Sequence, residues 1–175
     1  MEVYLIRHTT PEIAKGICYG QYDLDLARSF PSELKTIQQA LPKQVFNYPC
    51  FSSPLQRCSL LAQQLFKTVR FDERLKELNF GHWEMRAWDD IPKAELDPWM
   101  HDFVNTPTPQ GESYVDLHKR TTEFLEELRQ QNLTNAVLVT HGGVMRSIWA
   151  HVHDIPLNKS FDLKLSYGSI LKLQL

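Results

Sequence analysis

The chain has 175 residues, of which 42% are hydrophobic and 23% charged, with a net charge of −2 and a pI near 6.4. This composition is typical of one globular domain with a full core, and it lacks the basic face of proteins that bind nucleic acid non-specifically. No segment approaches the roughly 20 apolar residues of a membrane-spanning helix, and the N-terminus does not resemble a signal peptide, so we expect a cytoplasmic protein without a membrane partner.

The three cysteines are odd in number and none forms a C-x-x-C pair: Cys18, Cys50 and Cys58. This spacing argues against a disulfide framework or a zinc knuckle. We therefore expect three reduced thiols.

The first predicted strand covers residues 1–6, an apolar run that ends in Arg7-His8. The elements that follow are predicted from periodicity and from turn residues: a strand over 45–51, a helix over 54–66 with Ser53 as N-cap and Pro54 at its first position, a short strand over 68–71 and a structured loop over 74–84.

The second half of the chain continues the alternation of helices and strands. The predicted elements are a helix over 113–131 with Val115, Thr121, Phe124, Leu125 and Leu128 facing inward, a strand over 136–140, a helix over 144–153 and two late strands over 161–165 and 169–175. This order is typical of an α/β protein, and we expect a three-layer α/β/α sandwich with a mostly parallel central sheet.

Two predicted strands end in histidine, His8 and His141. Ligands of open α/β sheets bind at the carboxyl ends of parallel strands, so both imidazoles are expected on one rim. Arg7 leaves the same strand as His8, and Arg57 lies in the first turn of a helix that follows another strand. Two guanidiniums, two imidazoles and the free amides of the helix that is entered through Gly142 suit a doubly charged tetrahedral oxyanion such as a phosphate monoester.

Four segments, in this order, resemble the histidine phosphatase (phosphoglycerate-mutase-like) superfamily: Leu5-Ile6-Arg7-His8, Ser52-Ser53-Pro54-Leu55-Gln56-Arg57, Leu75-Lys76-Glu77 with Phe80-Gly81-His82-Trp83-Glu84, and Val139-Thr140-His141-Gly142-Gly143. The resemblance runs over nearly the whole chain. Within the superfamily, the short length, the segment from Phe80 to Arg86 and the segment from Gly16 to Gln21 are most similar to α-ribazole-5′-phosphate phosphatases of cobalamin nucleotide-loop assembly.

The resemblance implies a metal-independent phosphatase without a cofactor. It makes His8 the nucleophile that accepts the phosphoryl group, makes Arg7, Arg57 and His141 the groups that hold the phosphoryl oxygens, and makes Glu77 the proton donor. The chemistry agrees, because neighbouring guanidiniums disfavour the protonated imidazole and leave a lone pair for attack. A carboxylic acid beside a bound dianion can in turn keep its proton for the leaving oxygen.

Thr9 departs from the family, which usually has glycine after the histidine, and Ala14 stands where an asparagine is common. Either the backbone at Thr9 has an ordinary negative φ, or the threonine hydroxyl replaces a phosphate contact. We therefore include Thr9 among the phosphate-binding residues, and Gly142 is included because the free helix amides follow it.

A cap is expected over residues 82–115 of the single domain 1–175. Tyr19, Gln21, Trp83 and Glu112 are candidates for contact with the substrate. The aromatic residues of the cap suit a small hydrophobic cluster equally well, and Glu112 suits the start of a helix. We expect a structural role for Arg146, and the H-x-H pair His151 and His153 predicts no metal site, because residues two apart on a helix do not share a face.

The alternatives are a broad phosphatase for sugar phosphates or nucleotides, a mutase, for whose larger insertions the chain is short, and a non-catalytic module that binds a phosphorylated ligand. The pattern leaves open whether the protein is a monomer or a homodimer.

Overall fold

The computed structural model describes all 175 residues and has a five-stranded mixed sheet in the order β3-β2-β4-β1-β5. Four strands are parallel, and β5 pairs with β1 in the antiparallel sense. The strands are β1 (Glu2–Arg7), β2 (Cys50–Ser52), β3 (Val69–Phe71), β4 (Asn135–Thr140) and β5 (Ile170–Gln174).

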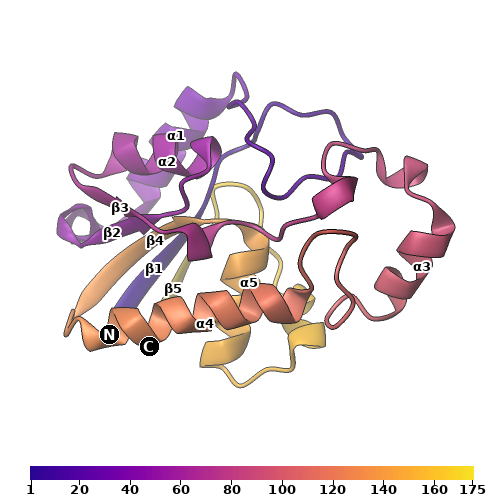
Figure 1. The fold of residues 1–175 in the computed structure, drawn as a ribbon. Helices are drawn as coiled ribbons and strands as arrows, with labels where there is room; N and C mark the ends of the chain where they lie inside the picture. Colours follow the sequence, from indigo (N-terminus) through magenta and orange to yellow (C-terminus); the bar gives the residue numbers. More distant parts are fainter.

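Helices cover both faces of this sheet, which confirms the predicted α/β architecture (Figure 1). The helices α1 (Phe30–Ala40) and α2 (Gln56–Leu65) pack on one face, and α4 (Tyr114–Gln130) and α5 (Gly142–Val152) pack on the other. The two termini lie side by side, and the Met1 amino group donates to the Leu175 carbonyl at 2.8 Å. None of the helices has the length and apolar character that crossing a bilayer requires.

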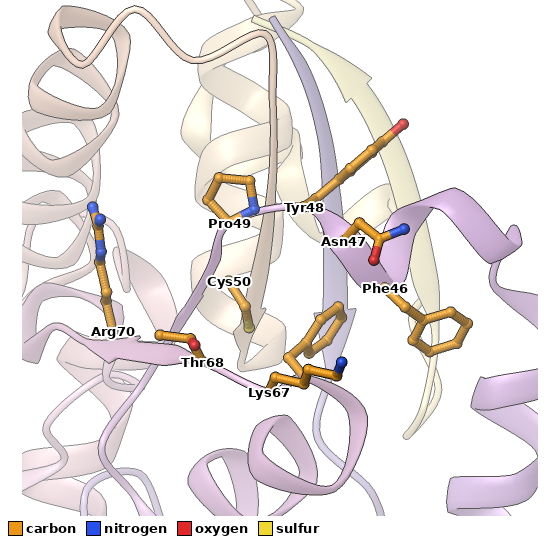
Figure 2. A pocket seen from close by; sticks show the side chains of 9 residues that line it. Phe46, Asn47, Tyr48, Pro49, Cys50, Lys67, Thr68 and Arg70 are labelled. Carbon is orange, nitrogen blue, oxygen red and sulfur yellow. The ribbon is translucent and has the colours of Figure 1, made fainter.

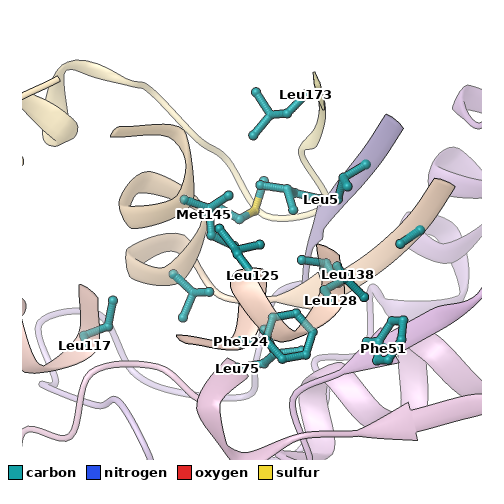
Figure 3. Packing of buried hydrophobic residues seen from close by; sticks show 14 of the residues in the cluster. Leu5, Phe51, Leu75, Leu117, Phe124, Leu125, Leu128, Leu138, Met145 and Leu173 are labelled. Carbon is teal, nitrogen blue, oxygen red and sulfur yellow. The ribbon is translucent and has the colours of Figure 1, made fainter. Parts of the chain in front are cut away.

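Alternate residues of the central strands enter two separate cores. Leu5 and Leu138 pack with α4 and α5, as Figure 3 shows, whereas Ile6 and Val139 pack against α1 and α2. Because successive side chains of a strand point to opposite faces, a strand covered on both sides reads as a continuous apolar run. This is why the two central strands were recognisable from the sequence.

Some local predictions were wrong, and two of them concern short apolar segments. Residues 45–51 do not form one strand, since a 3-10 helix over Lys43–Asn47 comes first and β2 begins only at Cys50. The strand predicted over 161–165 is replaced by a 3-10 helix over Leu157–Asp162, because aromatic packing of Phe161 on Phe103 and Tyr114 decides this short segment. Short apolar runs do not distinguish a strand from a turn of helix.

The helix predicted from residue 54 begins at Gln56 with Leu55 as its N-cap, and Ser53 instead accepts a hydrogen bond from the Leu55 amide at 3.3 Å. Val115, predicted to face inward, is 39% exposed. The helix α1 had no prediction, because its apolar positions are sparse and only Ile37 is fully buried.

The segment expected to form a cap, residues 82–115, contains the helix α3 (Lys93–His101) and short 3-10 turns, and it lies to one side of the sheet in Figure 1. A third hydrophobic cluster holds this segment together. It consists of Cys18, Trp83 and Ile91, with Phe80, Trp88, Leu96 and Trp99 packed around them.

Candidate active site

Adjacent parallel strands bring His8 and His141 together. The pairing of β1 with β4 places Arg7 opposite Thr140, so the residue after each strand reaches the same rim of the sheet. The two imidazole centroids lie 5.1 Å apart, and both side chains are almost fully buried. The predicted meeting of these two histidines is present in the fold.

The His8 ring is held in one tautomer. Its Nδ1 lies 2.7 Å from the Thr9 carbonyl oxygen, which can only accept, so Nδ1 carries the hydrogen and a neutral ring keeps its lone pair on Nε2. Burial, and then the charges of Arg57 and Arg7, lower the pKa of His8 well below its usual range. The ring is therefore neutral and ready to act as a nucleophile near pH 7.

The second imidazole has partners on the helix side of the site. His141 Nε2 lies 2.8 Å from Ser53 Oγ and 3.4 Å from Cys58 Sγ. Burial, followed by the charges of Arg57 and His8, also lowers the pKa of His141 well below its usual range. All three cysteines are buried free thiols, and Cys58 is the one that contacts the site.

Two arginines border the imidazoles without a carboxylate partner. Arg57 is fully buried in the first turn of α2 and donates to the backbone carbonyls of Gly20 and Tyr22. Arg7 donates to the Leu165 carbonyl at 2.8 Å, and its guanidinium stacks over the Tyr167 ring. Neither guanidinium forms an ion pair with an acidic side chain.

Unpaired buried polar atoms gather in this region. Four such side-chain atoms lack a hydrogen-bond partner, and three of them belong to Arg7, Arg57 and Thr9. Because buried donors are normally paired, donors left free beside two uncompensated cations favour an anion with several acceptor oxygens. Thr9 has no positive φ, so its backbone conformation is ordinary. Its hydroxyl group has no hydrogen-bond partner.

Glu77 reaches the same cavity from the loop before the cap. Its carboxylate accepts from the amides of Leu78 and Gly143, both at 3.0 Å. A Cβ at Gly143 would lie 2.3 Å from Glu77 Oε1, so a side chain at this position would displace the carboxylate from its present place. Gly142 lies beside Arg7, where a Cβ would meet Cζ at 3.3 Å.

Sequence reasoning missed the side chains that hold the Glu77 loop in place. Arg120, on α4, donates to the carbonyls of Arg74, Lys76 and Glu77. Thr140 donates to the Leu75 carbonyl at 2.7 Å. Backbone carbonyls carry no residue identity, so no sequence pattern could have indicated these contacts.

The cavity at the strand ends has a volume of about 250 Å³. Its walls combine charged and aromatic side chains: Arg7, His8, Ile17, Tyr19, Glu77, Leu78, Phe80, Trp88, Tyr114, Gly143, Arg146 and Phe161. Tyr19 is thus on the wall, as expected for a substrate contact. Arg146, expected to be structural, is there as well, and Tyr167, for which there was no prediction, stacks on the His8 ring.

Three other substrate candidates lie outside this wall. Trp83 is fully buried in the cap cluster and donates to Glu95. Glu112 pairs with Arg120 and accepts from the Asn79 amide. Gln21 donates to the Glu77 carbonyl at 3.0 Å. Their geometry gives Trp83 a packing role and gives Gln21 and Glu112 a role in supporting the Glu77 loop.

A second hollow, of about 380 Å³, lies at the opposite ends of the strands, where β2 and β3 begin (Figure 2). Its polar side chains include Lys67, Thr68 and Arg70, all of them exposed. No three histidine, cysteine or acidic side chains converge anywhere in the chain in a way that could hold a metal ion.

The proteins that this chain resembles are named as phosphatases or as phosphoglycerate mutases. The chain is 29% identical over 184 residues to a protein of Shigella boydii named probable phosphoglycerate mutase GpmB, an alignment that covers 99% of this chain and 84% of that one. It is 24% identical over 168 residues to phosphoserine phosphatase 1 of Hydrogenobacter thermophilus, covering 91% and 79% of the two chains.

The crystal structure of the α-ribazole phosphatase from Shigella flexneri superposes with a TM-score of 0.90 at 22% identity, covering 100% of this chain and 91% of that one. This likeness shows the phosphoglycerate-mutase-like fold. The model of the histidine phosphatase superfamily (branch 1) matches residues 3–175, and with the paired histidines and arginines described above it shows that the chain belongs to this superfamily.

Proposed function

We propose that this protein is a phosphomonoester hydrolase that works through a phosphohistidine on His8. The observation that carries the proposal is a buried neutral imidazole, with its Nδ1 hydrogen on the Thr9 carbonyl, beside unpaired donors of Arg7 and Arg57. A nucleophile with a fixed lone pair and cations placed in advance for the phosphoryl oxygens are what phosphoryl transfer requires.

In the first step His8 Nε2 attacks phosphorus and the bond to the ester oxygen breaks. Arg7, Arg57 and His141 hold the phosphoryl oxygens, and protonated Glu77 gives its proton to the leaving oxygen. The carboxyl group of Glu77 lies on the same cavity wall as His8, which suits this proton transfer.

In the second step water attacks the phosphohistidine. Glu77, now a carboxylate, accepts a proton from the water, the phosphorus–nitrogen bond breaks and inorganic phosphate leaves. Glu77 regains its proton and His8 its lone pair, so the cycle closes without an external cofactor.

The favoured substrate is α-ribazole 5′-phosphate, in cobalamin nucleotide-loop assembly. Support comes from the segments similar to α-ribazole phosphatases and from the aromatic walls of the cavity, which include Phe80, Trp88 and Phe161 and suit a leaving group with rings. A broad phosphatase for sugar phosphates or nucleotides uses the same chemistry with a less selective wall.

The test compares the wild-type protein with His8→Ala in the presence of EDTA. We expect the wild type to hydrolyse phenyl phosphate and to form an acid-labile phosphoenzyme in rapid-quench labelling, and we expect the variant to lose activity on the order of 10⁴-fold. Among physiological candidates, kcat/KM should be highest for α-ribazole 5′-phosphate.

Full activity of His8→Ala would refute the mechanism. A folded wild-type protein that forms no phosphoenzyme would favour a non-catalytic module, and interconversion of phosphoglycerates would favour a mutase. Equal kcat/KM values across sugar phosphates, nucleotides and the ribazole phosphate would favour the broad phosphatase.

A further inference from the structure

Arg146 leaves the second turn of α5 and reaches the wall of the catalytic cavity. Its Nε donates to the Leu163 carbonyl at 3.2 Å, and its guanidinium stacks 4.9 Å from the centre of the Phe161 ring. These contacts hold the side chain in place, yet its two terminal amino groups donate to no protein atom and it forms no ion pair.

A second guanidinium lies nearby. A Cβ at Gly142 would be 3.1 Å from Arg146 Nη1 and 3.3 Å from Arg7 Cζ, so both arginines converge on the first residue of α5. Burial, and then the charge of Arg7, lower the pKa of Arg146 below its usual value, and the Glu77 carboxylate opposes this shift. Two like charges arranged this way repel one another, and the Glu77 carboxylate of the same wall, or an oxygen of a bound ligand, offsets this repulsion.

Most other polar groups in and beside the wall already have hydrogen-bond partners. Tyr19 and Tyr167 hydrogen-bond to one another at 2.6 Å, and the Tyr114 hydroxyl contacts Ser160 and the Gly143 carbonyl. Glu77 accepts from two amides. Apart from the residues at the strand ends, free donors remain on Arg146 and on the indole nitrogen of Trp88, and Arg146 is the charged one of the two, with the Phe161 ring stacked on it.

We propose that Arg146 is the residue that recognises the leaving group, and that the substrate presents to it an oxygen acceptor, a sugar hydroxyl or a carboxylate, on a body that packs against the aromatic wall. This inference rests on the proposed phosphatase function, with phosphate held by Arg7 and Arg57. A guanidinium with two free amino groups suits paired oxygens, either of a carboxylate or of a vicinal diol.

The experiment measures kcat/KM for four substrates: phenyl phosphate, whose leaving group carries no other oxygen, α-ribazole 5′-phosphate, phosphoserine and 3-phosphoglycerate. The proteins are the wild type, Arg146→Met, Arg146→Lys and, as matched control, Arg129→Met on the exposed side of α4. The ratio of kcat/KM for each oxygen-bearing substrate to that for phenyl phosphate is independent of the fraction of folded enzyme.

We expect Arg146→Met to lower this ratio by about 10- to 100-fold for the oxygen-bearing substrate that the wild type prefers, because a charged hydrogen bond is lost. Arg146→Lys should recover part of the ratio, and Arg129→Met should leave it unchanged. A loss confined to α-ribazole 5′-phosphate identifies the hydroxyls as the acceptor, and a loss confined to the other two identifies a carboxylate.

An unchanged ratio in Arg146→Met for all substrates would overturn the inference, as would an equal loss with phenyl phosphate. Both results leave the proposed function intact, since wild-type hydrolysis and the phosphoenzyme are measured separately. A wild-type protein without either would instead refute the proposed function.

Discussion

Hollows with cationic side chains lie at both ends of the parallel strands. Only the hollow at the carboxyl ends has the chemistry of a binding site. At the edge where β2 and β3 begin, Lys67 and Arg70 are exposed, and Arg70 donates to Gln131. At the edge where β1 and β4 end, Arg57 is fully buried and has an unpaired donor. The hollow with the exposed cations is the larger of the two.

Burial and convergence of cationic side chains, rather than the volume of a hollow, indicate an anion site. Water screens an exposed cation, so its interaction with a ligand is weak. A buried cation without a counter-charge interacts strongly with whichever anion reaches it. Parallel strands produce the second situation at their carboxyl ends, where successive loops turn back over the same rim.

Substitution of Arg57 should have the strongest effect on activity, and it distinguishes the two ends of the strands directly. Arg57→Met should lower kcat/KM for phenyl phosphate by about 10²- to 10³-fold, because a charge that stabilises the transferred phosphoryl oxygens is lost. Arg57→Lys should recover only part of this, since lysine lacks the planar fork. Steady-state kinetics and calorimetry with inorganic phosphate measure both steps.

The matched control for that experiment is Arg70→Met at the opposite edge. Arg70 is exposed and lies away from the site. Its substitution should change kcat/KM by less than about twofold and the free energy of unfolding by less than about 0.5 kcal/mol. Comparable losses of kcat/KM in the Arg57 and Arg70 variants would contradict the assignment of the site to the carboxyl ends of the strands.

A smaller effect on activity is expected from Gly143→Ala. This substitution tests Glu77 as the general acid rather than the pocket that binds the phosphoryl group. The new methyl group would overlap the Glu77 carboxylate, so kcat for phenyl phosphate should fall by about 10²-fold while the affinity for inorganic phosphate stays unchanged. The loss should be smaller for 4-nitrophenyl phosphate, whose leaving group needs no proton. Equal losses for both esters would argue against displacement of a general acid.

The smallest effect concerns stability against pH. His8 and His141 have a lower pKa folded than unfolded, so the unfolded chain binds more protons as the pH falls through about 6.5, the ordinary histidine value. The free energy of unfolding should therefore decrease below that pH, by at most about 1.4 kcal/mol per pH unit for each ring. Urea unfolding at several pH values measures this slope.

His8→Gln should flatten that slope by the share of one ring, because glutamine does not titrate. A variant with the wild-type slope would show that His8 is protonated as easily in the folded protein as in the unfolded chain. This result would remove the neutral nucleophile on which the proposed mechanism depends.

The central strands, the helices α4 and α5 and the pair of histidines were predictable from the sequence, because each depends on local chemistry. A strand buried on both faces must be apolar throughout, as from Val3 to Ile6, and a polar group at its end is then conspicuous. Ser113 and Asp116 form a capping box at the start of α4, which is a short-range signal of the same kind.

The wall of the cavity was decided only by the tertiary structure. Arg146 and Tyr167 lie in segments with no distinctive pattern, and Arg120 acts on backbone carbonyls that any residue could supply. Their roles arise from contacts between segments far apart in the chain, whose partners and distances exist only after α4 and α5 have packed on the sheet. The amino-acid sequence was therefore enough to predict the family and the residues that meet at the strand ends, whereas packing determined which side chains surround the cavity.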